Sequence, residues 1–159
     1  MTHLPIAQQI LPAGTWTGAA ACCLLTYEQR FFRRRKLTVD AGWSLVADFE
    51  HTVSLGHGDA LALDDGRLVE IAAAPERLLA VTGADLPRLA WHIGNRHTPC
   101  QIGADQLLIR DDPVIAHMLA HLGATIEETT QAFTPEGGAY GHGRTHAHDH
   151  GHSAHVHSH

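Results

Sequence analysis

Histidine is the residue type in this sequence whose number and spacing indicate a chemical role. The 159-residue chain carries 15 histidines, and eight of them lie within its last 18 residues. Imidazole prefers nickel, copper, zinc and cobalt to magnesium or calcium, and its reference pKa of about 6.5 leaves much of it neutral and able to bind metal at pH 7. We therefore predict a metal-binding tail whose ligands are His142, His146, His148, His150, His152, His155, His157 and His159.

Two other interpretations of this tail stay open. A purification tag would be an uninterrupted run of histidine, whereas here Asp149, Ser153, Val156 and small residues interrupt the histidines. A pH-sensing tail would use the same imidazoles as proton acceptors. Histidine-rich composition does not identify one metal either, so Ni(II), Zn(II) and Cu(II) are all candidates.

Two further pairs of histidines lie in the part of the sequence that is expected to fold. His92 and His97 flank Gly94-Asn95-Arg96 where a helix should end, and taken alone each is more typical of a surface histidine than of a ligand. His117 and His121 are spaced i, i+4 on a second predicted helix and could chelate one ion, although no glutamate completes an HExxH motif between them.

The motifs of common catalytic sites are absent from the sequence. It contains no GxxxxGKS/T phosphate loop, no GxSxG, no GxGxxG and no HExxH. Paired carboxylates occur at Asp111-Asp112 and Glu127-Glu128, but Asp112 is predicted to cap a helix and the others to face solvent. We expect a protein that is not an enzyme, and a metallohydrolase using His117 and His121 is the alternative.

Composition and charge limit the partners. Hydrophobic residues make up 44% of the chain, as in ordinary folded domains, and the formal net charge is −6 with histidine neutral. Five of the eleven basic residues form one run, Arg30 and Arg33–Lys36, which we interpret as a solvated strand or turn, with an acidic or polyanionic partner as the alternative. We expect no nucleic-acid partner.

Cysteine spacing and hydropathy predict a cytoplasmic location. Cys22 and Cys23 are adjacent and Cys100 is far away, so neither a CxxC pair nor a disulfide framework is expected. No apolar stretch reaches the roughly 18 residues of a membrane span, and the first residues do not resemble a signal peptide. We expect no membrane partner.

Short apolar runs separated by turn residues predict an all-β first half, from Ala19 to Ile71. Its clearest element is a hairpin in which residues 59–63 and 67–71 flank Asp64-Asp65-Gly66. Asp-Gly provides the positive φ that a tight hairpin turn requires.

After Pro75 the pattern changes to strands that alternate with helices. A strand at residues 78–81 leads to a helix that begins after the N-cap Asp85 and has Pro87 in its first turn. Gly94 is predicted to end this helix. Its buried face should be Leu86, Leu89, Ala90 and Ile93.

Two further strands, a helix and a last strand complete the second half. The strands are predicted at residues 98–102 and 106–110. The helix opens at Asp112-Pro113 and closes at Gly123, and the last strand covers residues 125–133. The apolar stripe of this helix should be Val114, Ile115, Met118, Leu119 and Leu122.

This order of elements predicts an α+β protein in three parts. Residues 1–75 would form an N-terminal all-β domain, and residues 76–140 a ferredoxin-like βαββαβ domain with two helices on one antiparallel sheet. Folding should end near Tyr140, and residues 141–159 would be a disordered tail, because they cannot bury enough apolar surface to fold.

The string WHIGNRHTP at Trp91–Pro99 resembles the GNRHxP signature of the urease accessory protein UreE family, the nickel chaperones of urease maturation. The hairpin with its Gly-Asp…Asp-Asp-Gly pattern, the ferredoxin-like half, the Gly-Gly-Ala-Tyr close and the histidine-rich end fit the same family. The resemblance therefore covers nearly the whole chain. It departs from some relatives at Arg110–Pro113, where they carry further histidines.

The resemblance implies a peptide-binding-like N-terminal domain and a homodimer formed through the metal-binding C-terminal domain. It implies that His97 binds Ni(II) at the two-fold axis and that tail histidines complete the coordination. The partners that it implies are the urease accessory GTPase and the urease apoprotein complex. The expected function is delivery of nickel for assembly of the urease active site, with a cytosolic nickel or zinc buffer or store as the alternative.

Overall fold

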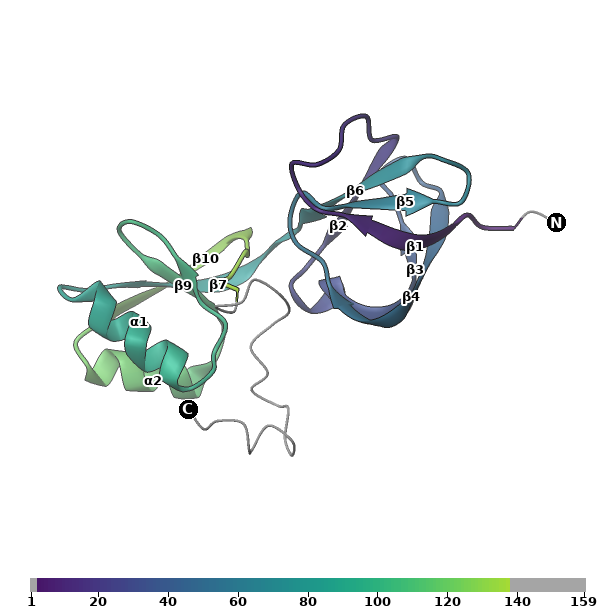
Figure 1. Ribbon diagram of the computed structural model, residues 1–159. Coiled ribbons are helices and arrows are strands. Elements are labelled where there is room, and N and C mark those ends of the chain that lie inside the picture. The colour runs from purple at the N-terminus through teal and green to yellow at the C-terminus, as the bar shows by residue number, and fades with distance from the viewer. Residues whose placement is uncertain (1–2, 138–159) are drawn as a thin grey trace. The chain divides into compact units, whose positions relative to one another are not determined.

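The computed structural model describes residues 3–137, which fold into two compact units (Figure 1). The first unit ends at Glu76 and also takes in Gln131–Thr134, while the second comprises Arg77–Thr130 and resumes at Pro135. An N-terminal β domain is followed by a domain of strands and helices, so the expected α+β class is confirmed. The predicted tail, residues 141–159, and the predicted end of folding near Tyr140 lie outside the described residues.

The first unit is a six-stranded sheet around an apolar core. Its strands, in the order β2-β6-β5-β1-β4-β3 across the sheet, include two parallel pairs, β1 with β4 and β2 with β6. The core contains Leu45, Leu61, Val69 and Ile71, none of which is exposed to solvent. The elements are β1 (Ile6–Leu11), β2 (Ala21–Leu25), a 3-10 turn (Glu28–Arg30), β3 (Phe31–Thr38), β4 (Ser44–Ser54), β5 (Ala60–Leu63) and β6 (Leu68–Ala73).

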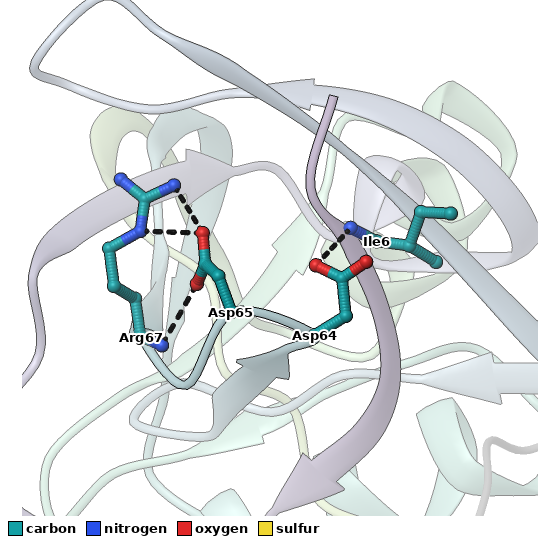
Figure 2. Close-up of polar contacts among 4 residues, drawn as sticks. All are labelled: Ile6, Asp64, Asp65 and Arg67. Carbon is teal, nitrogen blue, oxygen red and sulfur yellow. Dashed lines mark hydrogen bonds and ion pairs between the residues drawn. The ribbon is translucent and has the colours of Figure 1, made fainter. Parts of the chain in front are cut away.

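The predicted hairpin is confirmed as β5 and β6, which pair in antiparallel fashion. Gly66 has a φ of 91° and is the residue that makes the turn possible. Figure 2 shows how the turn is held: the Asp65 carboxylate accepts hydrogen bonds from the backbone and the guanidinium of Arg67, and Asp64 Oδ1 accepts one from the Ile6 amide at 3.2 Å. The turn is thereby tied to β1, and Arg67 lowers the pKa of Asp65 below its ordinary value.

The second unit has the βαββαβ order expected from the sequence. Its sheet order is β10-β7-β9-β8, and both helices lie on one face of the sheet (Figure 1). Leu79, Val81, Leu107 and Ile109 of the sheet form one buried cluster with Leu89 and Ile93 of the first helix and Ile115 and Leu119 of the second. The elements are β7 (Pro75–Thr82), α1 (Leu86–Asn95), β8 (Gln101–Ile102), β9 (Leu107–Arg110), α2 (Pro113–His121) and β10 (Thr125–Ala132).

Both helices begin where the sequence predicts. Asp85 Oδ1 accepts a hydrogen bond from the Arg88 amide at 3.3 Å, and Asp112 Oδ1 accepts from the amides of Val114 and Ile115 at 3.0 and 3.1 Å. The expectation that Val114 and Leu122 lie on the apolar stripe of α2 was wrong, because their side chains are 67% and 39% exposed and Leu122 is the C-cap of the helix. Val114 is rotated by about 100° around the helix from its buried neighbour Ile115, and it faces outward.

The basic run divides into two environments. The side chains of Arg33–Lys36 on β3 are exposed, as expected for a solvated strand. Arg30 is 3% exposed, which corrects the expectation of a solvated residue at that position. Its guanidinium donates hydrogen bonds to the carbonyl oxygens of Leu25, Leu55 and Phe133 at 2.9, 3.2 and 2.7 Å, and its burial lowers its pKa. Arg30 therefore joins three separate chain segments.

Candidate metal centre

The backbone at the end of α1 determines where the signature histidine lies. The helix continues through Gly94 to Asn95 and has Arg96 as its C-cap, so the expectation that Gly94 ends it was wrong. The His97 amide donates to the Gly94 carbonyl at 2.9 Å and the Thr98 amide to the Ile93 carbonyl at 3.3 Å. These two bonds make a Schellman motif with His97 at the position that follows the C-cap. Strand β8 is shorter than expected because the Thr98 amide is used here and Pro99 has no N–H.

His97 takes a conformation that glycine usually takes in this motif. Its φ is 58°, and among residues 3–137 it is the only residue other than glycine with a positive φ. Helix α2 ends in the same motif, where Gly123 has a φ of 93° and its amide and that of Ala124 donate to Ala120 and Leu119, each at 3.0 Å. A side chain in the left-handed region costs about 1–2 kcal/mol. The imidazole of His97 is exposed to solvent.

The groups near His97 in sequence do not complete a metal site. The ring of His92 is half-buried and packs edge-on against Trp91, with ring centroids 5.1 Å apart. Cys100 is buried, and this burial, with a smaller effect of Glu136, raises the pKa of its thiol to about 11. At neutral pH it is a protonated thiol and therefore a poor ligand. Within the part of the chain that the structure describes, no three His, Cys, Asp or Glu side chains gather to hold an ion.

The last described residues lie beside the segment that follows His97. The amide of Glu136 donates to the carbonyl of Cys100 at 2.8 Å, and Cys100 follows His97 by three residues. An extended chain spans about 3.5 Å per residue, so the six residues that follow Glu136 can span at most about 21 Å. The covalent geometry thus allows tail histidines to reach His97. The tail histidines themselves, His142 to His159, lie outside the described residues.

The second predicted histidine pair lies on the outer face of α2. His117 and His121 are both exposed, whereas Ile115 and Leu119 on the opposite face of this helix are 4% and 0% exposed. This pair lies on α2, whereas His97 follows the C-cap of α1.

Neither helix among residues 3–137 is long and apolar enough to cross a membrane.

Two family models match the chain and together cover nearly all of it. The model for the N-terminal domain of the UreE urease accessory protein matches residues 7–74, and the model for the C-terminal domain of the same protein matches residues 70–159. The matches follow one another in the order of the two structural units. The chain thus has the domain composition of a urease accessory protein.

Individual relatives agree with these matches. The chain is 55% identical over 143 residues to the urease accessory protein UreE of Ruegeria pomeroyi, covering 90% of this chain and 96% of that protein. It is 57% identical over 146 residues to that of Cereibacter sphaeroides, covering 91% and 80%, and 53% identical over 145 residues to that of Rhodobacter capsulatus, covering 91% and 92%. The chain belongs to the UreE family of urease accessory proteins.

Proposed function

We propose that this protein is a cytoplasmic carrier that binds Ni(II) and delivers it for assembly of the urease active site. The observation that carries the proposal is His97, an exposed imidazole held in the left-handed region at the end of α1 in a member of the urease accessory family. Folding fixes the backbone of this residue while its side chain stays accessible. Nickel is the cargo in this proposal, and zinc or copper would use the same nitrogen donors.

A homodimer through residues 76–140 would give His97 the partner that one chain lacks. A two-fold axis doubles every residue beside it, so two His97 imidazoles could share one ion at about 2 Å each. The second unit also has apolar side chains that a partner could cover, since Trp91 is 63% and Val114 67% exposed. Of these two residue types, tryptophan is the one enriched among the residues that contribute most to binding at interface centres.

The histidine tail would complete and enlarge the site. The bond from Glu136 to Cys100 supports this role, because it starts the tail beside the segment that carries His97. In this proposal the ligands are His97 with His142, His146, His148, His150, His152, His155, His157 and His159. An exposed site of exchangeable imidazoles would release nickel stepwise to a receiving protein, whereas a closed four-ligand site would retain it. The proposed receivers are the urease accessory GTPase and the urease apoprotein complex.

Native mass spectrometry of the full chain with and without nickel tests the metal site. We expect a dimer that binds several ions, and His97→Ala should remove one ion per dimer while most of the tail capacity stays. Deleting residues 142–159 should lower the number of bound ions while the dimer and at least one ion survive. His92→Ala is the matched control, because this histidine is engaged with Trp91 and should leave the ion count unchanged.

Delivery is tested by activating urease apoprotein with the nickel-loaded protein and the GTPase. His97→Ala should reduce activation at equal total nickel, and His92→Ala should not. A buffer or store would activate urease no better than the same concentration of free nickel. Equal activation by the wild type and the His97 variant would overturn the proposal.

A further inference from the structure

The outer face of α2 carries two histidines one helical turn apart. His117 and His121 are exposed, and neither imidazole makes a hydrogen bond or an ion pair within residues 3–137. On a helix, Cβ atoms at i and i+4 lie about 5–6 Å apart, which lets both imidazoles approach one ion to about 2.0–2.1 Å. We propose that His117 and His121 form a second metal site, a two-imidazole chelate for divalent nickel, copper or zinc.

The helix holds this pair in a fixed arrangement before any metal binds. At its start, Asp112 accepts hydrogen bonds from the amides of Val114 and Ile115, and at its end Gly123 and Ala124 complete the Schellman motif. Ile115 and Leu119 anchor the opposite face in the core. Only the side-chain torsions of the two histidines have to be ordered on binding, which keeps the entropic cost low.

The location of the pair also suits a divalent cation. His121 is the last residue of α2, and the C-terminal end of a helix carries a partial negative charge that favours cations. No third His, Cys, Asp or Glu side chain joins the pair within the described part of the chain, so water would occupy the other coordination positions. The site is therefore open and exchanges its ion readily, in contrast to closed structural sites.

This site is independent of the proposed role of His97, because it uses another helix, both of its ligands come from one chain, and it includes no tail residue. The test is a zinc titration of the whole chain, in which nuclear magnetic resonance monitors the imidazole rings. The titration is continued until the tail histidines are saturated with zinc and beyond that point. Zinc is diamagnetic, so each histidine reports its own binding. The rings of His117 and His121 should shift together, at a zinc concentration at least about tenfold lower than the lone exposed His51 of β4, because the second contact is intramolecular.

Three variants separate the outcomes. His117→Ala should move the response of His121 to about tenfold higher zinc, because the chelate is lost. The double variant H121A/L122H keeps the total number of histidines but moves the second imidazole to the C-cap of α2, off the shared face, and it should lose the site as well. His97→Ala should leave both rings responding as in the wild type, whatever it does to nickel delivery.

The proposal is overturned if His117 and His121 respond only together with His51, or if His117→Ala leaves the response of His121 unchanged. Loss of the paired response in His97→Ala would show that the pair depends on the His97 site and would also overturn it. Because both histidines are exposed and the core side chains Ile115 and Leu119 stay in place, the variants should fold, and the amide spectrum of each one verifies this.

Discussion

The hydrogen bonds that shape the turn at His97 join main-chain atoms and do not involve its side chain. The amides of His97 and Thr98 donate to Gly94 and Ile93, so the helix end depends on the φ of residue 97 and not on its imidazole. The side chain can therefore be exchanged without altering the turn, provided that the new residue tolerates a positive φ. This separates what His97 costs the fold from what it contributes to metal binding.

His97→Gly should raise the free energy of unfolding by about 1 kcal/mol, because glycine adopts the left-handed region without a Cβ penalty. The matched change on the other helix is Gly123→Ala, which should lower it by about 1 kcal/mol. A Cβ at Gly123 would meet no atom within 4 Å, so the effect there is purely conformational. Urea denaturation followed by circular dichroism measures both. A less stable His97→Gly protein would contradict this account of strain.

The cysteines should differ in reactivity because they differ in burial. Burial raises the pKa of Cys23 and of Cys100 from 9.0 to about 11. Cys22 is only partly buried, and its burial, together with the charges of Glu70 and Asp40, raises its pKa as well. At pH 8 iodoacetamide should modify Cys22 first and reach the other two only after unfolding, as peptide mass spectrometry can show.

The raised pKa values of Cys23 and Cys100 also predict how the free energy of unfolding depends on pH. Their contribution to it is fully present below pH 9 and is lost between pH 9 and about 11, because the thiols of the unfolded chain ionise first.

Helix α2 depends on its cap as well as on its buried face. Asp112→Ala should lower the free energy of unfolding by about 1 kcal/mol, since the amides of Val114 and Ile115 lose their acceptor. Asp112→Asn is the control, because an asparagine oxygen can accept the same bonds and should preserve most of the stability. Urea denaturation of both variants compares them. Equal losses in the two variants would show that charge, and not the hydrogen bonds, makes the contribution.

Elements fixed by local chemistry could be predicted from the sequence. The turn at Asp65-Gly66, the start of α2 at Asp112-Pro113 and its end at Gly123 each rest on a few adjacent residues, and the structure has all three. Strand β1 was missed because its Gln8-Gln9 pair breaks the apolar alternation. It forms because β4 and β5 bond to it on either side, which no local pattern encodes.

The site was only partly readable from residue types and spacing. Spacing alone predicted that His97 is an ordinary surface histidine. The prediction that the helix ends at Gly94 gave no indication that the backbone of His97 is left-handed. Its place was recognised through the GNRHTP string, whose residues the structure arranges as the Schellman motif. The role of the tail rests on composition and stays a prediction.

At the scale of the whole molecule, two separate segments of the chain make up the first unit. Gln131–Thr134, a segment that begins with the last two residues of β10, belongs to it again, and there Phe133 is fully buried and packs edge-on against Tyr27 with ring centroids 5.4 Å apart. Arg30 binds the Phe133 carbonyl, and the Glu76 carboxylate accepts from the Tyr27 amide at 2.9 Å. The N-terminal family match ends at residue 74, so part of the packing of the first unit lies outside that match.

A fragment of residues 1–76 should therefore be less stable than the same unit within the full chain. Without residues 131–134, Tyr27 loses its contact with the Phe133 ring, and Arg30 loses its shortest hydrogen bond, at 2.7 Å to the Phe133 carbonyl. In the full chain Phe133→Ala should reproduce much of this loss, at about 3–5 kcal/mol for a buried phenylalanine. Glu127→Ala is the control and should change little, because Glu127 is an exposed position on β10, the strand that ends one residue before Phe133. Hydrogen exchange of the amides in β2 and β6 measures the stability of the first unit itself in the fragment and in each variant.

If the fragment protects these amides as well as the full chain does, residues 131–134 do not stabilise the first unit. If only the fragment and Phe133→Ala lose protection, the C-terminal segment is part of the fold of the N-terminal unit.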